Sequence, residues 1–496
     1  MQTFTPHSEA ESPSCPDGSA LAPRRVPTST IQRRAPTGRP STPVAARTYA
    51  HLYGTLFWPA WERLIRGRTT ARHLDFVQAM QWQPRETIER YQLVALRALL
   101  GDAQRHIPYW RQLFKRLGFD ARDVRGPGDL RALPILTREI VRERYRDLVH
   151  PAYASTNLKK GTSGSTGTPL KFEYSPESES WRQAIRIRSY SWSGYRPGLP
   201  TFYYWALVSR PPRGSRGLKI RFDRTFKRET FVDSMHQNED ARRRALELFK
   251  RARPSVVICY TQSCAQFARW ILDRGLRDWD DVPVLCGAEA VLAADRAVLA
   301  RAFGPEIFET YGSRETMLLA AECEAHDGMH LMDENLLVEV IRDGKPAQPG
   351  ETGDVLVTDL HNYGMPFIRY RNGDVATTST GDACRCGRGL RKIQRVDGRR
   401  ADTLVDSEGN PIPGVVFHVL FSDARQEIIR QFQAVQRRSG AVLLRVVRGQ
   451  DWSGDRFDGI ARRFTEYLRG LPFEVEFCDS IPPSPTGKMK TIVVEL

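Results

Sequence analysis

The sequence predicts an α/β protein in which a large N-terminal domain of mixed and parallel sheets with helices precedes a small α+β C-terminal domain. Between residues 155 and 395, short β-rich runs alternate with helical segments, and connections of this length favour right-handed parallel crossovers. A break near residues 396–402 is followed by further strand-like and helical runs. We therefore expect a disordered tail over 1–45, a large domain over 46–397 and a small domain over 398–496.

The composition is that of a folded chain with a basic surface. Of 496 residues, 41% are hydrophobic, which excludes a wholly disordered, collagenous or coiled-coil protein. No apolar run approaches the ~20 residues of a bilayer span. We see no secretory signal, and eight cysteines are too few for a disulfide scaffold, so we expect a cytoplasmic protein. The net charge of +16 indicates an anionic partner: nucleic acid, a membrane surface or a phosphorylated ligand.

The first ordered elements are predicted to be helices. The tail is rich in Pro, Ser, Thr and Arg and lacks apolar periodicity, whereas order begins near Tyr49. Apolar residues recur at helical spacing between Ile88 and Leu100, and a second helix is predicted around Trp110–Leu117. A third helix follows Thr137, whose side chain suits an N-cap.

The centre of the chain alternates strands and helices. Strands are predicted over 255–260, 282–287 and 307–312, with helices over 262–274 and 294–303 between them. The later runs LLVEVI, GDVLVTDL and FIRYRNGDV are also predicted strands, joined by Gly- and Asn-containing turns.

The C-terminal domain is predicted from four segments. AVLLRVVRG and FEVEFCD have the composition of strands, and helices are expected over Val415–Phe421 and Asp455–Leu468.

A segment rich in glycine and hydroxyl groups, GTSGSTGTPL, occupies residues 161–170 and precedes the strand-like run LKFEY. Glycines let backbone N–H groups converge on an anion, and Thr162, Ser163, Ser165 and Thr166 add hydroxyl donors. It is not a Walker A loop, because the terminal Gly-Lys-Ser/Thr is missing. A phosphate-binding loop and a flexible linker both fit this composition.

Three further motifs carry charged side chains. IFETYGSRE places Glu315 just beyond a predicted parallel strand, at the edge where open α/β sheets bind ligands and where a carboxylate can hold Mg²⁺ beside phosphates. Asp374 in YRNGD follows a glycine turn and can accept from ribose hydroxyls. Lys488 lies in PTGKMK near the end of the chain. Each motif alone also fits an ordinary solvated turn.

A group of cysteine and histidine residues matches the composition of a zinc site. Cys323, His330, Cys384 and Cys386 supply a Cys₃His set, which can bind zinc tetrahedrally. The spacing is not that of a standard zinc finger, and His326 is a competing ligand. Free cysteines in turns are the alternative interpretation.

The order of the motifs is more specific than any one of them. GTSGSTGTPL, GAEAV, YGSRE, GETGDVLVTDL…FIRYRNGD, DGRRAD and PTGKMK follow one another as the serial motifs of the adenylate-forming superfamily do. Over residues 85–496 the chain resembles most closely the phenylacetate–CoA ligase branch, including CapK-like proteins. The resemblance implies a mobile C-terminal domain and two half-reactions. A carboxylic acid and MgATP give an acyl-adenylate and pyrophosphate, and a thiol, usually that of coenzyme A, then displaces AMP.

The resemblance also implies roles for individual residues. The implied nucleotide site consists of Thr162, Ser163, Ser165, Thr166, Ala288, Glu289, Tyr311, Gly312, Asp374 and Arg399. Glu315 would bind Mg²⁺, Lys488 would bridge the acyl carboxylate and the α-phosphate, and Asp402 would be the hinge. The implied structural zinc ligands are Cys323, His330, Cys384 and Cys386.

The chain departs from the family pattern at three positions. Leu170, Arg314 and Ala401 stand where a lysine, a threonine and a second acidic residue are usual. The first and third leave ATP chemistry plausible, whereas Arg314 leaves open how the acyl carboxylate approaches.

The sequence is therefore compatible with three functions. The leading one is an acid–CoA ligase for an aryl or other small carboxylic acid, using ATP, Mg²⁺ and coenzyme A. A second keeps the adenylate but transfers the acyl group to an amine or a sugar hydroxyl in a polysaccharide or secondary-metabolite pathway. A third is a non-catalytic anion-binding protein that uses basic segments such as 241–254. No specific nucleic-acid module is evident, and a homodimer is compatible with the sequence.

Overall fold

The computed structural model describes residues 44–495 with internal gaps. Outside the described residues lie 1–43, 162–169, 206–213, 235–237, 382, 400–403, 406–410, 413–427, 451, 469, 483–489 and 496. The tail predicted over 1–45 therefore falls almost wholly outside them, and its last two residues belong to the first helix, which begins at Val44.

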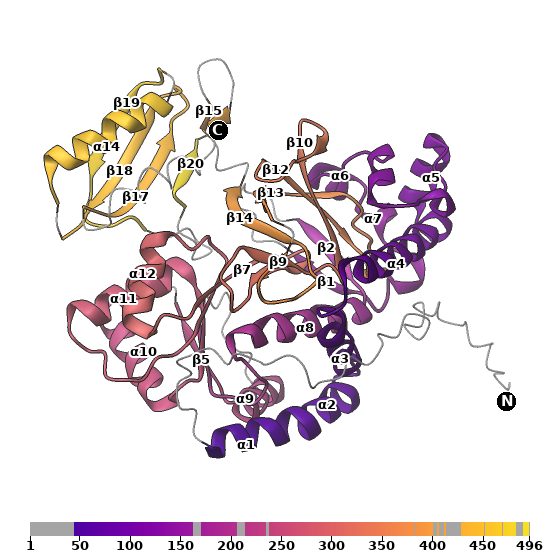
Figure 1. Cartoon of the computed structure of the whole chain (residues 1–496), viewed down its shortest axis with the longest axis horizontal. Helices are drawn as coiled ribbons and strands as arrows, with labels where there is room; N and C mark the ends of the chain where they lie inside the picture. The colour runs from indigo at the N-terminus through magenta and orange to yellow at the C-terminus, as the bar shows by residue number, and fades with distance from the viewer. Residues whose placement is uncertain are drawn as a thin grey trace.

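Helices form the N-terminal part of the described chain (Figure 1). The helical segment Val44–Ile65 consists of α1 (Val44–Leu52), η2 (Tyr53–Phe57), α2 (Trp58–Ala60) and η3 (Trp61–Ile65). It is followed by α3 (Thr70–Met80), α4 (Arg85–His106), α5 (Pro108–Leu117), η4 (Ala121–Asp123), η5 (Pro127–Ala132), α6 (Arg138–Glu143), α7 (Tyr145–Leu148) and η6 (Pro151–Tyr153). The Thr137 hydroxyl accepts from the Ile140 N–H, so the predicted N-cap is confirmed.

A twelve-stranded sheet forms the centre of the molecule, in the order β11-β10-β12-β13-β14-β9-β8-β7-β6-β5-β3-β4. Its strands are β3 (Thr201–Trp205), β4 (Glu229–Asp233), β5 (Val256–Tyr260), β6 (Val284–Gly287), β7 (Ile307–Ser313), β8 (Met317–Glu322), β9 (Met329–Leu331), β10 (Leu336–Arg342), β11 (Lys345–Pro346), β12 (Thr352–Asp359), β13 (Tyr370–Thr378) and β14 (Lys392–Arg399). The strands β4-β3-β5-β6-β7 pair in parallel. The pairs on the other side of β7 are antiparallel.

Both faces of the parallel half are buried. Alternate residues of β5, Val257 and Cys259, pack in a core with helices, while Val256 and Ile258 pack in a second core on the opposite face. The helices of this region are α8 (Pro176–Tyr190), η7 (Ser191–Ser193), α9 (Ser215–Lys227), α10 (Glu239–Ala252), α11 (Thr261–Asp273) and α12 (Ala293–Phe303). The predicted alternation of strands and helices between 255 and 312 is confirmed, with boundaries shifted by at most two residues.

Two short antiparallel pairs lie outside the large sheet. β1 (Leu158–Gly161) pairs with β2 (Lys171–Tyr174), with Gly161 opposite Lys171. The glycine-rich segment therefore connects the ends of a hairpin. β15 (Leu404–Val405) pairs with β16 (Pro411–Ile412).

The C-terminal part forms its own sheet with its own core. Its elements are β17 (Ile429–Gln436), β18 (Val442–Arg448), α14 (Gly454–Tyr467), β19 (Phe473–Phe477) and β20 (Ile492–Val494), and the strand order is β19-β18-β17-β20. The strands predicted at AVLLRVVRG and FEVEFCD and the later helix are confirmed, whereas β17 was not predicted. The helix expected over Val415–Phe421 lies outside the described residues. Across the described chain, no helix is both long enough and apolar enough to span a bilayer.

Candidate functional site

β7 is the strand at which the large sheet changes from parallel to antiparallel pairing. Glu309 pairs in parallel with Cys286 of β6, and Ser313 pairs antiparallel with Met317 of β8. A Cβ at Gly312 would overlap the carbonyl oxygen of Met317, so the close approach of the two strands requires glycine here. The YGSRE motif therefore lies at the C-terminal edge of the parallel strands, as predicted.

Tyr311, Asn372 and Asp374 form a closed triangle of hydrogen bonds at this edge. The Tyr311 hydroxyl donates to Oδ2 of Asp374 at 2.8 Å. Nδ2 of Asn372 donates to the Tyr311 hydroxyl at 2.7 Å and to Oδ2 of Asp374 at 2.8 Å. All three side chains are buried. Two donors on one oxygen fix the orientation of the Asp374 carboxylate, and the structure thus joins two predicted residues that are 63 positions apart.

Glu315 is buried next to this triangle, with 3% of its surface exposed. Its Oε1 accepts from the Tyr370 hydroxyl at 3.0 Å and from Nη2 of Arg138 at 3.2 Å. The same Arg138 nitrogen reaches the backbone oxygen of Asn372 at 3.5 Å, which connects Glu315 to the triangle. Burial raises the pKa of Tyr370, and the nearby Glu315 carboxylate raises it further, so the hydroxyl stays protonated and donates.

Sequence reasoning missed the residues that hold Glu315. Arg182 donates to the Glu315 backbone oxygen at 2.6 Å and forms a buried ion pair with Asp359, yet nothing in its sequence context marks it. Tyr370 belongs to the quoted YRNGD motif and could have been found there. Arg138 directly follows the predicted N-cap Thr137, so the sequence places it at the start of a helix. Its contact with Glu315 is not visible in the local sequence.

Ala288 and Glu289 lie in the loop after β6. Ala288 has a left-handed backbone with φ of 69°. The Glu289 carboxylate accepts from the Gln262 N–H at 3.0 Å, and its backbone oxygen accepts from the Thr261 hydroxyl at 2.9 Å. Glu289 therefore caps the N-terminus of α11, and the loop is held at the same edge of the sheet as β7.

Several predicted site residues cannot be placed. Thr162, Ser163, Ser165, Thr166, Asp402 and Lys488 lie outside the described residues. The backbone of Arg399 is the register partner of Asp374 in the β13–β14 pair.

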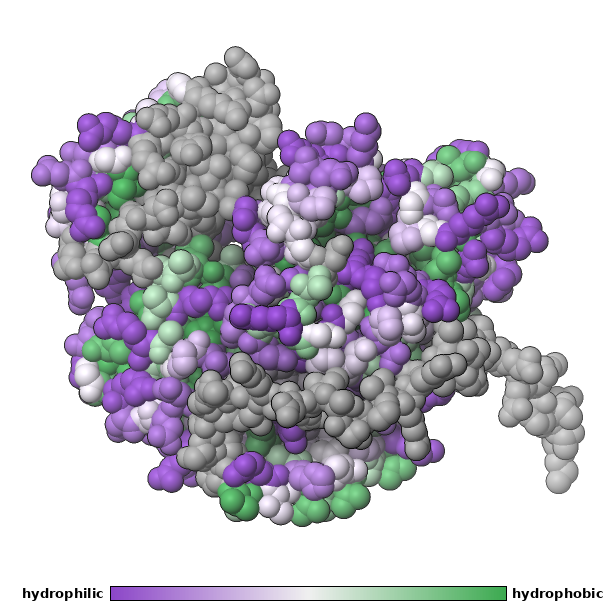
Figure 2. All heavy atoms as spheres, viewed as in Figure 1, coloured by the Kyte–Doolittle hydropathy of each residue, from purple (hydrophilic) through white to green (hydrophobic). Residues whose placement is uncertain are grey.

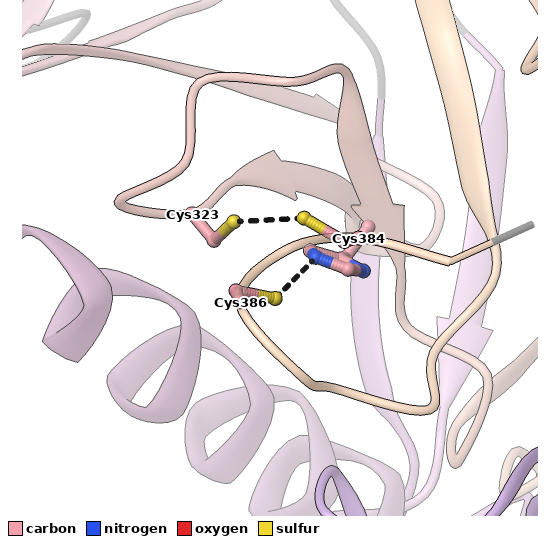
Figure 3. Close-up of side chains that lie close together, drawn as sticks. Cys323, Cys384 and Cys386 are labelled. Atoms are coloured by element: carbon pink, nitrogen blue, oxygen red, sulfur yellow. Dashed lines mark hydrogen bonds between the residues drawn. The ribbon is translucent and has the colours of Figure 1, made fainter. Parts of the chain in front are cut away.

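The predicted cysteine and histidine residues come together (Figure 3). The ligand atoms of Cys323, His330, Cys384 and Cys386 all lie within 4.8 Å of one another. The Cys323 and Cys384 sulfurs are 3.7 Å apart, and Nε2 of His330 lies 3.2 Å from the Cys386 sulfur. Nδ1 of His330 lies 3.2 Å from the Leu390 carbonyl, which leaves Nε2 facing the sulfurs.

The surroundings of the cluster favour a thiolate at Cys386, whereas they raise the pKa values of Cys323 and Cys384. The Ala325 N–H donates to the Cys323 sulfur and the Arg388 N–H to the Cys386 sulfur. Hydrogen bonds from Cys323 and His330 lower the pKa of Cys386 to about 2. The competing ligand His326 is not in the cluster, because it contacts Glu322 and Glu306 instead.

Comparisons with known proteins agree with this arrangement. No family model matches the chain. The chain is 28% identical over 377 residues to the phenylacetate–coenzyme A ligase of Thermus thermophilus, which covers 72% of this chain and 80% of that protein. It is 24% identical over 340 residues to the enzyme of the same name from Escherichia coli, with 66% of this chain and 75% of that protein covered. It is 20% identical over 368 residues to Protein CapK of Staphylococcus aureus, with 73% of this chain and 79% of that protein covered.

A solved structure of 2-hydroxyisobutyryl-CoA ligase has the same fold. It aligns with a TM-score of 0.66 at 17% identity and covers 84% of this chain and 91% of that one. Together, the serial motifs and the sequence similarity make this chain similar to the phenylacetate–coenzyme A ligase-like branch of the adenylate-forming superfamily, and its fold is that of a coenzyme A ligase of known structure.

Proposed function

We propose that the protein is an ATP-dependent, AMP-forming acid–coenzyme A ligase. The observation that carries this proposal is the buried Tyr311–Asn372–Asp374 triangle with Glu315 beside it, at the edge where β7 joins the two halves of the sheet. Similarity to two phenylacetate–coenzyme A ligases supports the same activity. The acid's carboxylate attacks the α-phosphate of ATP and pyrophosphate leaves. The thiol of coenzyme A then displaces AMP from the acyl-adenylate.

The described residues suit the nucleotide end of this reaction. The Asp374 carboxylate, oriented by Tyr311 and Asn372, accepts from the ribose hydroxyls. Glu315 contributes a carboxylate oxygen to Mg²⁺, which neutralises charge on the phosphates when bound. Tyr370 and Arg138 hold the Glu315 carboxylate in one position for that role. Arg399, on the strand next to Asp374, steadies the nucleotide.

The remaining roles fall to segments outside the described residues. Thr162, Ser163, Ser165 and Thr166 bind the leaving phosphates, and the β1–β2 hairpin supports this because it holds both ends of their segment. Lys488 supplies positive charge between the acyl carboxylate and the α-phosphate. A hinge at Asp402 lets the C-terminal part, from about residue 398, move between the half-reactions.

We infer a small, flat carboxylic acid as the substrate class. Trp205 and Tyr260 end the neighbouring parallel strands β3 and β5, and their ring centres are 4.3 Å apart. An added Cβ at Gly287 on the next strand would approach the Trp205 ring at 3.4 Å, so glycine keeps space beside this aromatic pair. Aromatic walls suit an aryl or similarly apolar acyl group.

The test is pyrophosphate release and acyl-CoA formation over a panel of aryl and small aliphatic acids. Lys488→Ala should reduce adenylation far more than thioester formation from ready-made acyl-adenylate. Lys490→Ala in the same PTGKMK motif is the matched control and should retain both steps. Equal loss of both half-reactions in Lys488→Ala contradicts its role, and a wild-type protein that activates no acid in the panel contradicts the proposal.

A second candidate keeps the adenylate and changes the acceptor. The similarity to Protein CapK favours it. In that case an amine or a sugar hydroxyl replaces the coenzyme A thiol. Stoichiometric AMP formation with a defined amine or sugar, in the absence of coenzyme A, supports this candidate over the first.

We also propose that the Cys₃His cluster binds a structural zinc. Four soft or borderline donors within 4.8 Å, two of them receiving backbone N–H groups, fit a tetrahedral Zn²⁺. Metal analysis of the purified protein should find about one zinc per chain, and Cys384→Ser should lose it. Cys478→Ser, outside the cluster, should keep it. A wild-type protein without bound metal, or Cys384→Ser with full zinc, contradicts the assignment.

A further inference from the structure

Exposed apolar side chains are concentrated on two helical elements. The described chain has thirteen exposed large hydrophobic residues, and nine of them lie on the helical segment Val44–Ile65 or on α9. We call these nine residues the apolar face; they are Val44, Leu52, Leu56, Phe57, Leu64, Ile65, Leu218, Phe222 and Phe226. Such a concentration on one part of a folded protein marks an interaction surface.

The apolar face follows the helical repeat of both elements. Leu52, Leu56 and Leu64 are spaced by four or eight positions, with exposed fractions of 47%, 62% and 77%. Leu218, Phe222 and Phe226 on α9 are also four apart, and each is more than half exposed. Residues at this spacing share one side of a helix, so each element presents a continuous apolar stripe to the outside. Figure 2 shows apolar residues along the lower edge of the molecule, where α1 and α2 lie in Figure 1.

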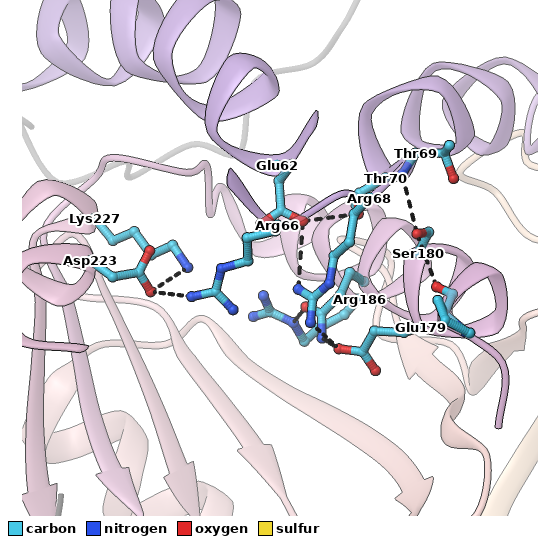
Figure 4. A network of polar contacts seen from close by, with 12 residues as sticks. Glu62, Arg66, Arg68, Thr69, Thr70, Glu179, Ser180, Arg186, Asp223 and Lys227 are labelled. Atoms are coloured by element: carbon cyan, nitrogen blue, oxygen red, sulfur yellow. Dashed lines mark hydrogen bonds and ion pairs between the residues drawn. The ribbon is translucent and has the colours of Figure 1, made fainter. Parts of the chain in front are cut away.

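The two elements are fastened to each other. The Tyr49 hydroxyl donates to the backbone oxygen of Phe226 at 2.8 Å. Nη2 of Arg66 pairs with Oδ2 of Asp223 at 3.0 Å, and Lys227 binds the same oxygen at 3.0 Å (Figure 4). The C-terminal turn of α9 is therefore held against the long helical segment, and the two stripes belong to one surface.

The charges around the apolar face have one sign. The two elements contain seven arginine or lysine residues and only two acidic residues, and Arg66 directly follows the first element. Glu62 is buried against Arg68, and the half-buried Asp223 is paired as described above. Among side chains that the structure describes, the exposed charges here are basic: Arg47, Arg63, Arg66 and Arg221.

The combination of exposed apolar side chains and positive charge distinguishes between possible binding partners of this surface. A second copy of the chain would bring two basic surfaces together, which like-charge repulsion opposes. Residues 1–43 contain five arginines and three acidic residues, so they have the same sign. Nucleic acid offers phosphates but no apolar phase for leucine and phenylalanine side chains. An anionic lipid surface offers both an apolar layer and negative charge above it.

We propose that the apolar face binds the surface of an anionic lipid bilayer. Leu56, Phe57, Leu64, Phe222 and Phe226 enter the boundary between headgroups and acyl chains, and the flanking arginines contact lipid phosphates. Glu315, between β7 and β8, and Asp374, on β13, belong to neither element of the apolar face. This proposal does not depend on the ligase activity.

The experiment is co-sedimentation of the full chain with vesicles. Vesicles of equal parts phosphatidylglycerol and phosphatidylcholine should bind the protein, phosphatidylcholine alone should bind it weakly, and 0.5 M salt should release it. The double variant Phe222→Ser, Phe226→Ser should weaken binding by about fivefold or more. Leu117→Ser, which removes an exposed leucine (44%) elsewhere, is the matched control and should bind as the wild type does.

Further measurements separate the alternatives. Thermal unfolding and ATP-dependent activity in solution should be unchanged in the double variant, because its two side chains are exposed and outside the site. Arg63→Glu should weaken binding to anionic vesicles only. Equal binding of the double variant and the wild type to vesicles overturns the proposal. So does light scattering that shows a dimer in the wild type and a monomer in the double variant, or retention of the wild type on nucleic acid but not on vesicles.

Discussion

Replacing Tyr311 by phenylalanine tests the triangle at the end of β7 with the smallest chemical change. The variant removes one hydroxyl, which donates to Oδ2 of Asp374 at 2.8 Å and accepts from Nδ2 of Asn372 at 2.7 Å. The ring stays in place, because Tyr311 packs in the core of the antiparallel half of the sheet. Asp374 then loses one of the two donors on Oδ2 and keeps the one from Asn372.

The expected effect follows from the value of a hydrogen bond to a charged group. Such a bond contributes about 1.5–3 kcal/mol. Since Asn372 still holds the carboxylate, we take the lower end, about 1.5 kcal/mol, which corresponds to about a tenfold loss in kcat/KM for ATP. The loss should fall mainly on the KM for ATP, because the ribose contact is present before and during the reaction.

The assay is exchange of labelled pyrophosphate into ATP, which reports adenylation alone. Tyr145→Phe is the matched control, since its hydroxyl also donates to a buried carboxylate, that of Glu173, at 2.5 Å. The control should keep the wild-type kcat/KM. If Tyr311→Phe stays within twofold of the wild type, or if Tyr145→Phe loses as much, the triangle does not orient the nucleotide and the reasoning is refuted.

Three further predictions concern other groups. Glu315→Gln should lower the adenylation rate by about a hundredfold or more with little change in thermal stability, measured by the same exchange assay; an unchanged rate contradicts a Mg²⁺ role. Arg188→Met should destabilise the fold by about 3–5 kcal/mol in urea unfolding, because it leaves the fully buried Glu334 carboxylate without its ion-pair partner. Contacts with Glu306 and Glu322 raise the pKa of His326 to about 9, so its contribution to stability is complete below the ordinary histidine pKa and disappears as the pH rises through 9. His326→Gln should accordingly be less stable than the wild type at pH 6 and equal to it at pH 10, and an equal deficit at both pH values contradicts this.

The parts of the site that the sequence predicted are those carried by local patterns. The strand before Gly312 ends in YGSRE, and Asp374 follows a glycine turn, so each motif could be assigned to a sheet edge by itself. Their union in one hydrogen-bonded triangle depends on the order of strands in the sheet, which no short pattern specifies. Arg138 and Arg182 reach Glu315 from helices more than 130 positions away, and such contacts leave no mark on the local sequence.

Some strands were missed for an equally physical reason. β8 reads MLLAAE, whose leucines and alanines have high helix propensity, yet it forms a strand because β7 and β9 supply partners on both sides. The sequence alone also does not show whether His326 or His330 belongs to the cluster, because this depends on the tertiary structure. His330 lies on β9 and faces the sulfurs, whereas His326 sits in a turn with φ of 49° and is directed to carboxylates.

The Cys₃His cluster has a consequence for the nucleotide site as well as for local packing. Cys323 and Cys384 are 61 positions apart in the chain, and the segment between them contains Asn372 and Asp374. A metal ion bound by both sulfurs, as proposed above, would be a cross-link across that loop. In the chain-entropy treatment of cross-links, closing a loop of this length lowers the conformational entropy of the unfolded chain. This raises the free energy of unfolding by about 4 kcal/mol. If Asp374 binds the ribose as proposed, the order of its strand would then depend on metal supply, and a zinc-starved cell would lose ATP affinity through a site that does not touch ATP.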